Sequence, residues 1–258
     1  MVRCLKVGKM EKVITTFIII MIVVSITMYH NKQSEVEPQI SNVELIEVDG
    51  SLQHEAMRHL IAPYKATKEA SMNVVIGEAM ETMEVGKPES KLTNLVADVL
   101  LTEGRKYIVD VDIAIVNVGS IRRTLYEGDI TIGDVFEILP FDNALLVLEY
   151  KGADILALAD AIAAKGGEAI AGMTLTIRDG KAEDVRVGGA EVDTAKIYKV
   201  VSTDYLSWGN DQLVSLANYV KFTPLNMMLR DAVFDYVTCA TIREEKIVSK
   251  LDKRIIIR

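Results

Sequence analysis

Residues 117–143 read "NVGSIRRTLYEGDITIGDVFEILPFDN", and they follow the apolar run "DIAIV" at 112–116. The apolar run is typical of a buried strand, and the polar stretch after it is typical of a loop. Arg122 stands just beyond the strand, where a guanidinium commonly binds an anion or a polar ligand. Phe141, in a Leu-Pro-Phe sequence, offers a flat aromatic face. The stretch therefore predicts a strand that leads into a ligand-binding loop, with a ring nearby.

Alternating strand and helix patterns extend to both sides of this stretch. Apolar residues in "ESKLTNLVADVL" recur at helical spacing, and Thr131 stands three residues before Asp134, a spacing typical of a helix start. Asp179-Gly180 lies between two short β-type runs and predicts a hairpin. Strands are predicted at 72–79, 112–119, 144–152, 173–178, 181–187 and 197–206, and helices at 51–63, 89–100, 131–139, 152–164 and 223–241. The expected fold is an α/β domain with a mixed β-sheet and helices packed on it.

Composition and charge limit the possible functions. The chain has 258 residues, 50% of them hydrophobic, which suffices for one well-formed core. Its net charge of −8 argues against a general DNA- or RNA-binding protein, because such a protein needs a basic face to neutralise phosphates. A single small anion, held by one or two well-placed cations, remains compatible with this charge.

The N-terminal part differs from the rest of the sequence. Basic residues precede residues 13–29, which are uncharged and apolar; they are Arg3, Lys6, Lys9 and Lys12. This pattern predicts a signal anchor or a signal peptide, and Met10 is an alternative start. The expected organisation is a basic flank plus signal segment at 1–32, a tether at 33–50 and a domain at 51–258. The domain would lie outside the cytoplasmic membrane, anchored through 13–29, or secreted if the segment is cleaved.

Cysteine and histidine usage gives no metal site. Cys4 and Cys239 would lie on opposite sides of the anchor, so no disulfide is expected within the exported part. His54 and His59 stand five positions apart, whereas metalloprotease histidines stand four apart on one helix face. The sequence also contains no phosphate-binding glycine loop of the G-x-x-x-x-G-K-[ST] type and no G-x-S-x-G motif. We therefore assign no catalytic residue and no metal ligand.

The stretch at 117–143 resembles the C-terminal domain of 5′-nucleotidases, whose pattern runs Asn-x-Gly-x-Ile-Arg, Gly-x-Ile-Thr and Leu-Pro-Phe-x-Asn. Three further blocks are similar to that family and keep its order: "PESKLTNLVADVL", "LEYKGADIL" and "VVSTDYLSWGNDQL". Together the four blocks cover roughly residues 72–213. The resemblance implies the fold of that domain and a nucleotide or nucleoside ligand.

The resemblance also implies which residues bind the ligand. Asn117 would bind the base, Gly119 would let the backbone approach closely, Arg122 would reach the ribose or phosphate, and Phe141 would stack on the base. The full set of implied substrate-binding residues is Asn117, Gly119, Arg122, Phe141, Asn143, Gly209, Asp211 and Leu213.

The sequence departs from the family pattern at several of these positions. Leu213 stands where we align the family's second stacking phenylalanine, and Trp208 is a possible substitute for that ring. Val118 and Ser120 replace glycines of the first loop. An arginine that the family often carries before the Glu-x-x-x-x-Asn-Leu helix is missing, and Lys87 is the nearest cation.

In whole enzymes of this family, an N-terminal metallophosphoesterase domain holds two metals and performs the hydrolysis. The motifs of that domain are absent from this sequence, whose three histidines could not build such a centre. The resemblance thus implies a nucleotide-binding domain that acts with a separate metallophosphoesterase protein, where the divalent metals would bind. Two alternatives stay open: an interaction module that has lost nucleotide binding, and a hydrolase that acts on its own.

Overall fold

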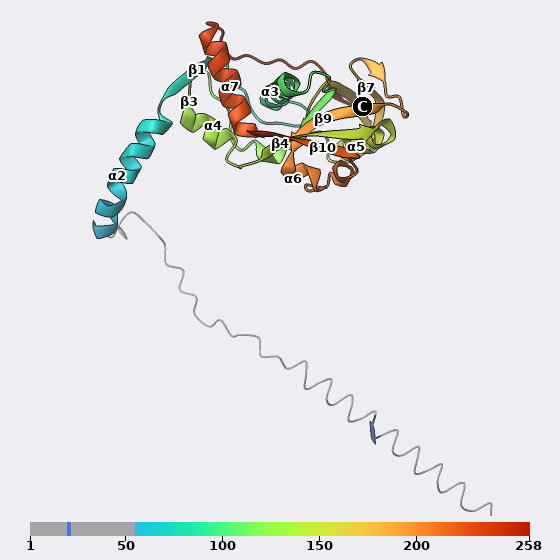
Figure 1. The fold of residues 1–258 in the computed structure, drawn as a ribbon, viewed down its shortest axis with the longest axis horizontal. Helices are drawn as coiled ribbons and strands as arrows, with labels where there is room; N and C mark the ends of the chain where they lie inside the picture. The colour runs from blue at the N-terminus through green and yellow to red at the C-terminus, as the bar shows by residue number, and fades with distance from the viewer. Residues whose placement is uncertain (1–19, 22–54) are drawn as a thin grey trace, which may run out of the picture. The chain divides into compact units, whose positions relative to one another are not determined.

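The computed structural model describes residues 20–21 and 55–258, and Ala56–Arg258 form one compact unit (Figure 1). The tether at 33–50 and the first four residues of the helix predicted at 51–63 lie outside the described residues. The same holds for the predicted anchor at 13–29, except for its residues 20–21. Within the described ranges, no helix is both long enough and apolar enough to cross a membrane.

A five-stranded mixed sheet lies at the centre of the domain. Its strand order is β10 (Lys221–Met228), β4 (Ala144–Lys151), β9 (Ile197–Thr203), β2 (Ile113–Val116) and β5 (Ala169–Ala171). Strands β2 and β9 run parallel, and the other neighbouring strands are antiparallel. The predicted α/β fold with a mixed sheet is confirmed.

Two smaller sheets flank the central one. The first pairs β1 (Val75–Ala79) with β3 (Gly128–Thr131). The second has the order β11 (Ile255–Ile257), β6 (Met173–Arg178), β7 (Lys181–Val187) and β8 (Ala190–Glu191). Asp179 and Gly180 connect β6 to β7 with φ values of 50° and 73°, as a tight hairpin turn with two left-handed residues requires. The predicted hairpin is confirmed.

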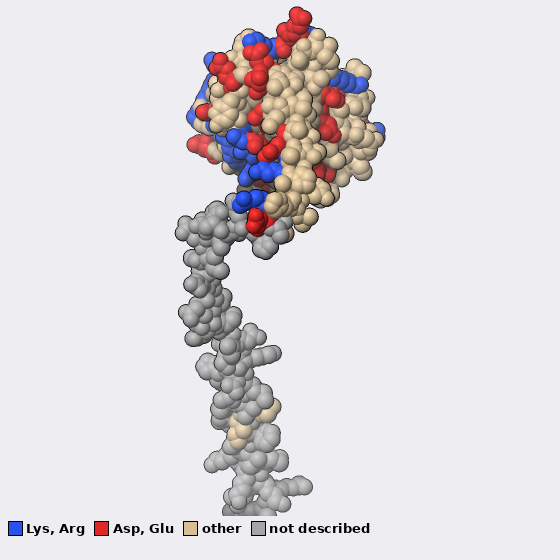
Figure 2. All heavy atoms as spheres, turned by 90° about the vertical axis from the view of Figure 1, so that its left-hand side faces the viewer, with Lys and Arg blue, Asp and Glu red and all other residues tan. Residues whose placement is uncertain are grey.

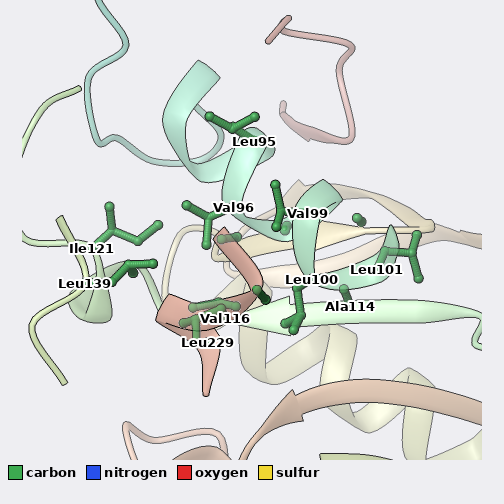
Figure 3. Close-up of a cluster of buried hydrophobic side chains, with 14 of the residues drawn as sticks. Leu95, Val96, Val99, Leu100, Leu101, Ala114, Val116, Ile121, Leu139 and Leu229 are labelled. Atoms are coloured by element: carbon green, nitrogen blue, oxygen red, sulfur yellow. The ribbon is translucent and has the colours of Figure 1, made fainter. Parts of the chain in front are cut away.

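Helices cover both faces of the central sheet. On one face, α3 (Lys91–Tyr107) and α7 (Leu229–Ile242) share a core with Ala114 and Val116 of β2. Figure 3 shows Leu100 of α3 beside Ala114, with Val96 and Val99 on the same side of the strand, and all belong to one buried cluster. On the other face, α5 (Gly152–Ala164) packs in a second core with Ile113 and Ile115. Because both side-chain rows of β2 are buried, this strand reads as a continuous apolar run in the sequence.

The helix starts follow local hydrogen bonds. In α4 (Ile132–Ile138), the Asp134 amide donates to Thr131 Oγ1 at 3.1 Å and the Thr131 amide donates to Asp134 Oδ2 at 2.8 Å, so the predicted cap is confirmed. Ser90 caps α3 through the Thr93 amide. The shorter helical segments are η2 (Val118–Ser120), α6 (Asp204–Ser207) and η3 (Val214–Ala217).

Several predicted boundaries are wrong. α3 continues to Tyr107 instead of ending at 100, and the strand predicted to reach 206 ends at Thr203, directly before α6. The first helix was expected to end near Pro63, but α2 (Glu55–Met72) continues through it, because proline removes only one backbone donor and "KATKEAS" follows with good helix-forming residues. Thr223 and Pro224 were expected to start a helix, but they lie in β10, opposite Val147 and Leu146. This strand is at the sheet edge, where the missing N–H of a proline is tolerated.

Charges of both signs are spread over the surface. Figure 2 shows one face of the molecule, on which Lys and Arg side chains lie close to Asp and Glu side chains. Cys239, the cysteine within the described ranges, lies in α7 and is partly exposed rather than fully buried.

Candidate functional site

The sheet topology brings the predicted loops together at one end of the strands, which is called the site edge below. β2 ends at Val116, so Asn117 leaves the sheet there, and its parallel neighbour β9 ends at Thr203 on the same edge. β4 runs antiparallel to β9 and pairs Leu145 with Thr203, so the start of β4, preceded by Asn143, also lies at this edge. In open α/β sheets this is where ligands commonly bind.

A cavity of about 320 Å³ opens at this site edge, beyond the C-terminal ends of β2 and β9. Its lining residues are Asn117, Gly119, Ser120, Arg122, Phe141, Asn143, Tyr205 and Asp211. All of the substrate-binding residues implied by the sequence lie here except Gly209 and Leu213. Residues that are distant in sequence therefore form one site.

The first wall is the loop after β2. Ser120 Oγ donates to Asn117 Oδ1, and the Ser120 amide donates to the Asn117 carbonyl at 2.9 Å. The Asn117 Nδ2 group has no hydrogen-bond partner among the residues that the structure describes, so it is free to donate to a ligand. A Cβ at Gly119 would stand 3.4 Å from this Nδ2 atom, which is an ordinary van der Waals contact.

Arg122 supplies the positive charge of the cavity. Its backbone amide donates to the Ile138 carbonyl at 2.8 Å, and its Nη1 donates to the Gly119 carbonyl at 3.2 Å. The guanidinium has five N–H donors, so most of them remain available to an anion. The neighbouring Arg123 does not line the cavity and is paired with Glu137.

Two aromatic rings line the cavity from two different turns. Phe141 is 46% exposed and Tyr205 is 41% exposed. Arg230 of α7 holds the first turn, because its Nη1 donates to the Leu139 carbonyl at 3.1 Å and its Nη2 donates to the Asp142 carboxylate. Both residues are thus partly accessible to solvent, and the backbone that carries Phe141 is held in place.

Asp204 links the segment that follows Phe141 to the segment that contains Tyr205. Its carboxylate accepts hydrogen bonds from the Ala144 amide at 3.1 Å and from the Tyr205 amide at 2.7 Å. The start of β4 and the start of α6 are thus linked through one side chain.

Asp211 places a carboxylate in the cavity beside a lysine. Lys165 Nζ lies 2.9 Å from Asp211 Oδ1. Burial lowers the pKa of Lys165, but hydrogen bonds from its ammonium group to Glu168 and Asp211 outweigh burial and raise the pKa above its ordinary value. The lysine therefore stays charged and balances the carboxylate.

Three of the residues suggested by the sequence do not line the cavity. Leu213 is fully buried in the core that contains α5, so it contacts no ligand. Trp208, suggested as a substitute ring, is 74% exposed and does not line the cavity. Gly209, with φ +77°, shapes the turn before Asp211 but does not line the cavity.

The second ring is instead Tyr205, which the sequence analysis missed. The available signal was its place directly after β9, the parallel partner of β2.

Within residues 20–21 and 55–258, no three His, Cys, Asp or Glu side chains lie close enough together to hold a metal ion. The described residues thus do not fit the two-metal centre of a metallophosphoesterase.

Comparisons with known proteins agree with this architecture. The family described as "5'-nucleotidase, C-terminal domain" matches residues 70–218. Endonuclease YhcR of Bacillus subtilis is 29% identical over 210 residues, 78% of this chain and 15% of YhcR. Protein UshA of Escherichia coli is 23% identical over 171 residues, 64% of this chain and 31% of UshA.

Among solved structures, a 5′-nucleotidase precursor from Thermus thermophilus is similar with a TM-score of 0.68 and 25% identity, over 78% of this chain and 42% of that protein. The chain spans less than half of the length of each of these three proteins.

Proposed function

Because the chain belongs to the 5′-nucleotidase C-terminal domain family, we propose that its cavity binds a nucleotide or nucleoside. The observation that carries this proposal is the joining of two accessible rings, one arginine and one carboxylate around a single cavity of about 320 Å³. A volume of this size is typical of small-ligand sites.

The chemistry of the lining suggests one role for each group. Phe141 and Tyr205 offer faces on which a base can stack. Arg122 carries the fixed positive charge that a phosphate requires. The Asp211 carboxylate can accept hydrogen bonds from the hydroxyl groups of a ribose, and Asn117 can donate a hydrogen bond to the base through Nδ2.

Catalysis is proposed to come from a separate metallophosphoesterase protein. The sequence contains three histidines and none of the metal-binding motifs of such a domain, which supports a role in recognition rather than in hydrolysis. The divalent metals would then bind to the partner protein, and this chain would present the nucleotide to it.

We further propose that residues 13–29 anchor the chain in the cytoplasmic membrane with residues 51–258 on the outer side. The basic flank before an uncharged apolar segment supports this orientation. Two measurements test this proposal. In cell fractionation the untreated chain should sediment with membranes, and in protease-treated intact spheroplasts the domain should be digested. A domain protected until lysis would contradict the proposed orientation.

The binding proposal is tested by calorimetric titration of the chain with AMP, adenosine and UDP-glucose. Substitution Arg122→Ala is expected to weaken AMP binding about tenfold, the loss of one charge-assisted contact. Adenosine, which has no phosphate, should lose much less affinity.

The matched control is Arg123→Ala, which removes the neighbouring arginine that is paired with Glu137 outside the cavity. This variant should bind AMP as the unsubstituted chain does. If the two variants lose the same amount of AMP affinity, Arg122 has no specific role in binding AMP.

One observation favours a second function, an interaction module without nucleotide binding. Trp208 and Val214 are large apolar residues that are 74% and 69% exposed, on either side of Asp211 in the sequence. Single exposed apolar residues are common, but two from neighbouring segments fit a protein contact. A folded chain that gives no heat with any of the three ligands would favour this function.

A further inference from the structure

Glu168 is a buried carboxylate that the proposed ligand contacts do not use. It lies directly before β5 and is 2% exposed. Its Oε1 atom lies 2.7 Å from Lys165 Nζ and 3.2 Å from Lys87 Nζ, and its Oε2 atom accepts the Val118 amide at 2.6 Å. A buried carboxylate is costly unless it is paired and hydrogen-bonded, and here both oxygens are satisfied.

One of these bonds holds the first wall of the cavity. Val118 stands between Asn117 and Gly119, both of which line the cavity. Its amide is at the start of the short helical segment η2, where backbone donors have no partner within the helix. Glu168 provides that partner and so fixes the loop after β2 from behind.

The second connection runs through Lys165 to the 209–213 loop, the second wall, which contributes Asp211 to the cavity. Lys165 Nζ donates to the Asp211 carbonyl at 2.6 Å and is also bound to Asp211 Oδ1 and Glu168 Oε1. An ammonium group has three donors, so these three acceptors use it fully.

The loop that Lys165 holds has a strained backbone. Asp211 and Gln212 have φ values of 55° and 61°. These values lie in the left-handed region, which residues other than glycine adopt uncommonly. Such conformations persist only where surrounding contacts hold them. The two bonds from Lys165 to Asp211 are contacts of this kind.

We propose that Glu168 is a positioning residue that holds the two walls of the cavity together. It binds the 117–120 loop directly and the 209–213 loop through Lys165. The effect on ligand affinity rests on the proposed function, but the effect on the two loops does not. The four charged groups of this network, Lys87, Lys165, Glu168 and Asp211, balance one another, so the network adds no net charge beside the ligand.

Hydrogen–deuterium exchange on the full, unliganded chain tests the proposal. Substitution Glu168→Gln is expected to speed amide exchange about tenfold in both loops, because it removes the charge-assisted bonds that hold them. Lys165→Met should speed exchange in the 209–213 loop alone. Unchanged exchange in either loop of Glu168→Gln would overturn the proposal.

Glu103→Gln is the matched control. Glu103 is equally buried and lies 2.6 Å from one lysine, Lys106, within α3, with no bond to either loop. It should leave the exchange of both loops unchanged. If it speeds them as much as Glu168→Gln does, general destabilisation explains the result and the positioning role is wrong.

Adenosine titration then measures the consequence for binding. Glu168→Gln should weaken adenosine binding about tenfold, and a double-mutant cycle with Asp211→Asn should show non-additive losses. Unaltered adenosine affinity in Glu168→Gln would overturn the positioning role. If the unsubstituted chain binds no nucleoside, the proposed function fails, while the exchange experiment still decides whether Glu168 holds the loops.

Discussion

Replacing Phe141 with alanine is expected to weaken adenosine binding by about 1–3 kcal/mol, roughly five- to 150-fold. The ring is 46% exposed and lines the cavity. Its turn is fixed by the two hydrogen bonds from Arg230, so it needs little ordering when a base stacks on it. Calorimetric titration with adenosine measures the loss, since adenosine has the base and ribose but no phosphate.

The control for this prediction is Phe222→Ala. Phe222 lies on the edge strand β10, is 54% exposed and does not line the cavity. It tests whether loss of any exposed ring lowers the affinity. Phe222→Ala should bind adenosine normally, whereas Tyr205→Ala should lose affinity as Phe141→Ala does. Full affinity in Phe141→Ala, with the fold intact, would exclude stacking at this position.

The contiguous part of the site could be predicted because its geometry is local. Asn117, Arg122 and Phe141 lie within one stretch in which a strand end, a capped helix and a turn follow one another. Neighbouring residues predict where these features begin, although distant residues, Arg230 and Glu168, also hold the turn and the loop in place. The cap of α4 is a local feature, because Thr131 and Asp134 bond to one another.

The second ring could not be placed because its direction depends on a very short helix. α6 has four residues, about one turn, so no helical periodicity indicates that Tyr205 lines the cavity. Leu213 lies after α6, directly before η3, and is buried. Alignment to the family pattern placed the second ring at Leu213, because an alignment gives the order of residues along the chain but not which of them are buried. The direction became clear only from the packing of Leu213 against the α5 side of the sheet.

Long-range polar contacts are equally invisible in the sequence. Glu168 meets Val118 and Lys87 across 50 and 81 positions of the chain. Nothing in the local sequence distinguishes it from an exposed glutamate. The edge position of β10, which makes Pro224 compatible with a strand, is likewise a property of the assembled sheet.

Arg254→Ala is expected to destabilise the fold by about 1–3 kcal/mol, because it removes a buried guanidinium that is hydrogen-bonded to two partly exposed carboxylates and to a backbone carbonyl. The side chain is buried and donates to Asp98 at 2.9 Å, to Asp252 at 2.8 Å and to the Ile170 carbonyl at 2.8 Å. These bonds tie the C-terminal segment to α3 and to β5. Urea denaturation of the chain and the variant measures the change in the free energy of unfolding.

Arg178→Ala is the control for this second prediction. Arg178 is paired with Glu183 at 3.0 Å, but both side chains are about half exposed. An exposed pair contributes about 0–1 kcal/mol, so this variant should unfold close to the midpoint of the unsubstituted chain. Similar losses in the two variants would show that burial of the Arg254 network adds nothing.

The pH dependence gives an independent check on the same network. The hydrogen bond from Arg254 lowers the pKa of Asp252 below its ordinary value, although burial opposes this. The stabilisation from Asp252 is therefore complete above the pKa of the unfolded chain, about 3.9, and is lost as the pH falls through the lower folded-state pKa. Without Arg254 this part of the acid sensitivity disappears, so the difference in unfolding free energy between the chain and Arg254→Ala should narrow below about pH 4. A constant difference from pH 7 to pH 3 would show that Asp252 is not coupled to Arg254.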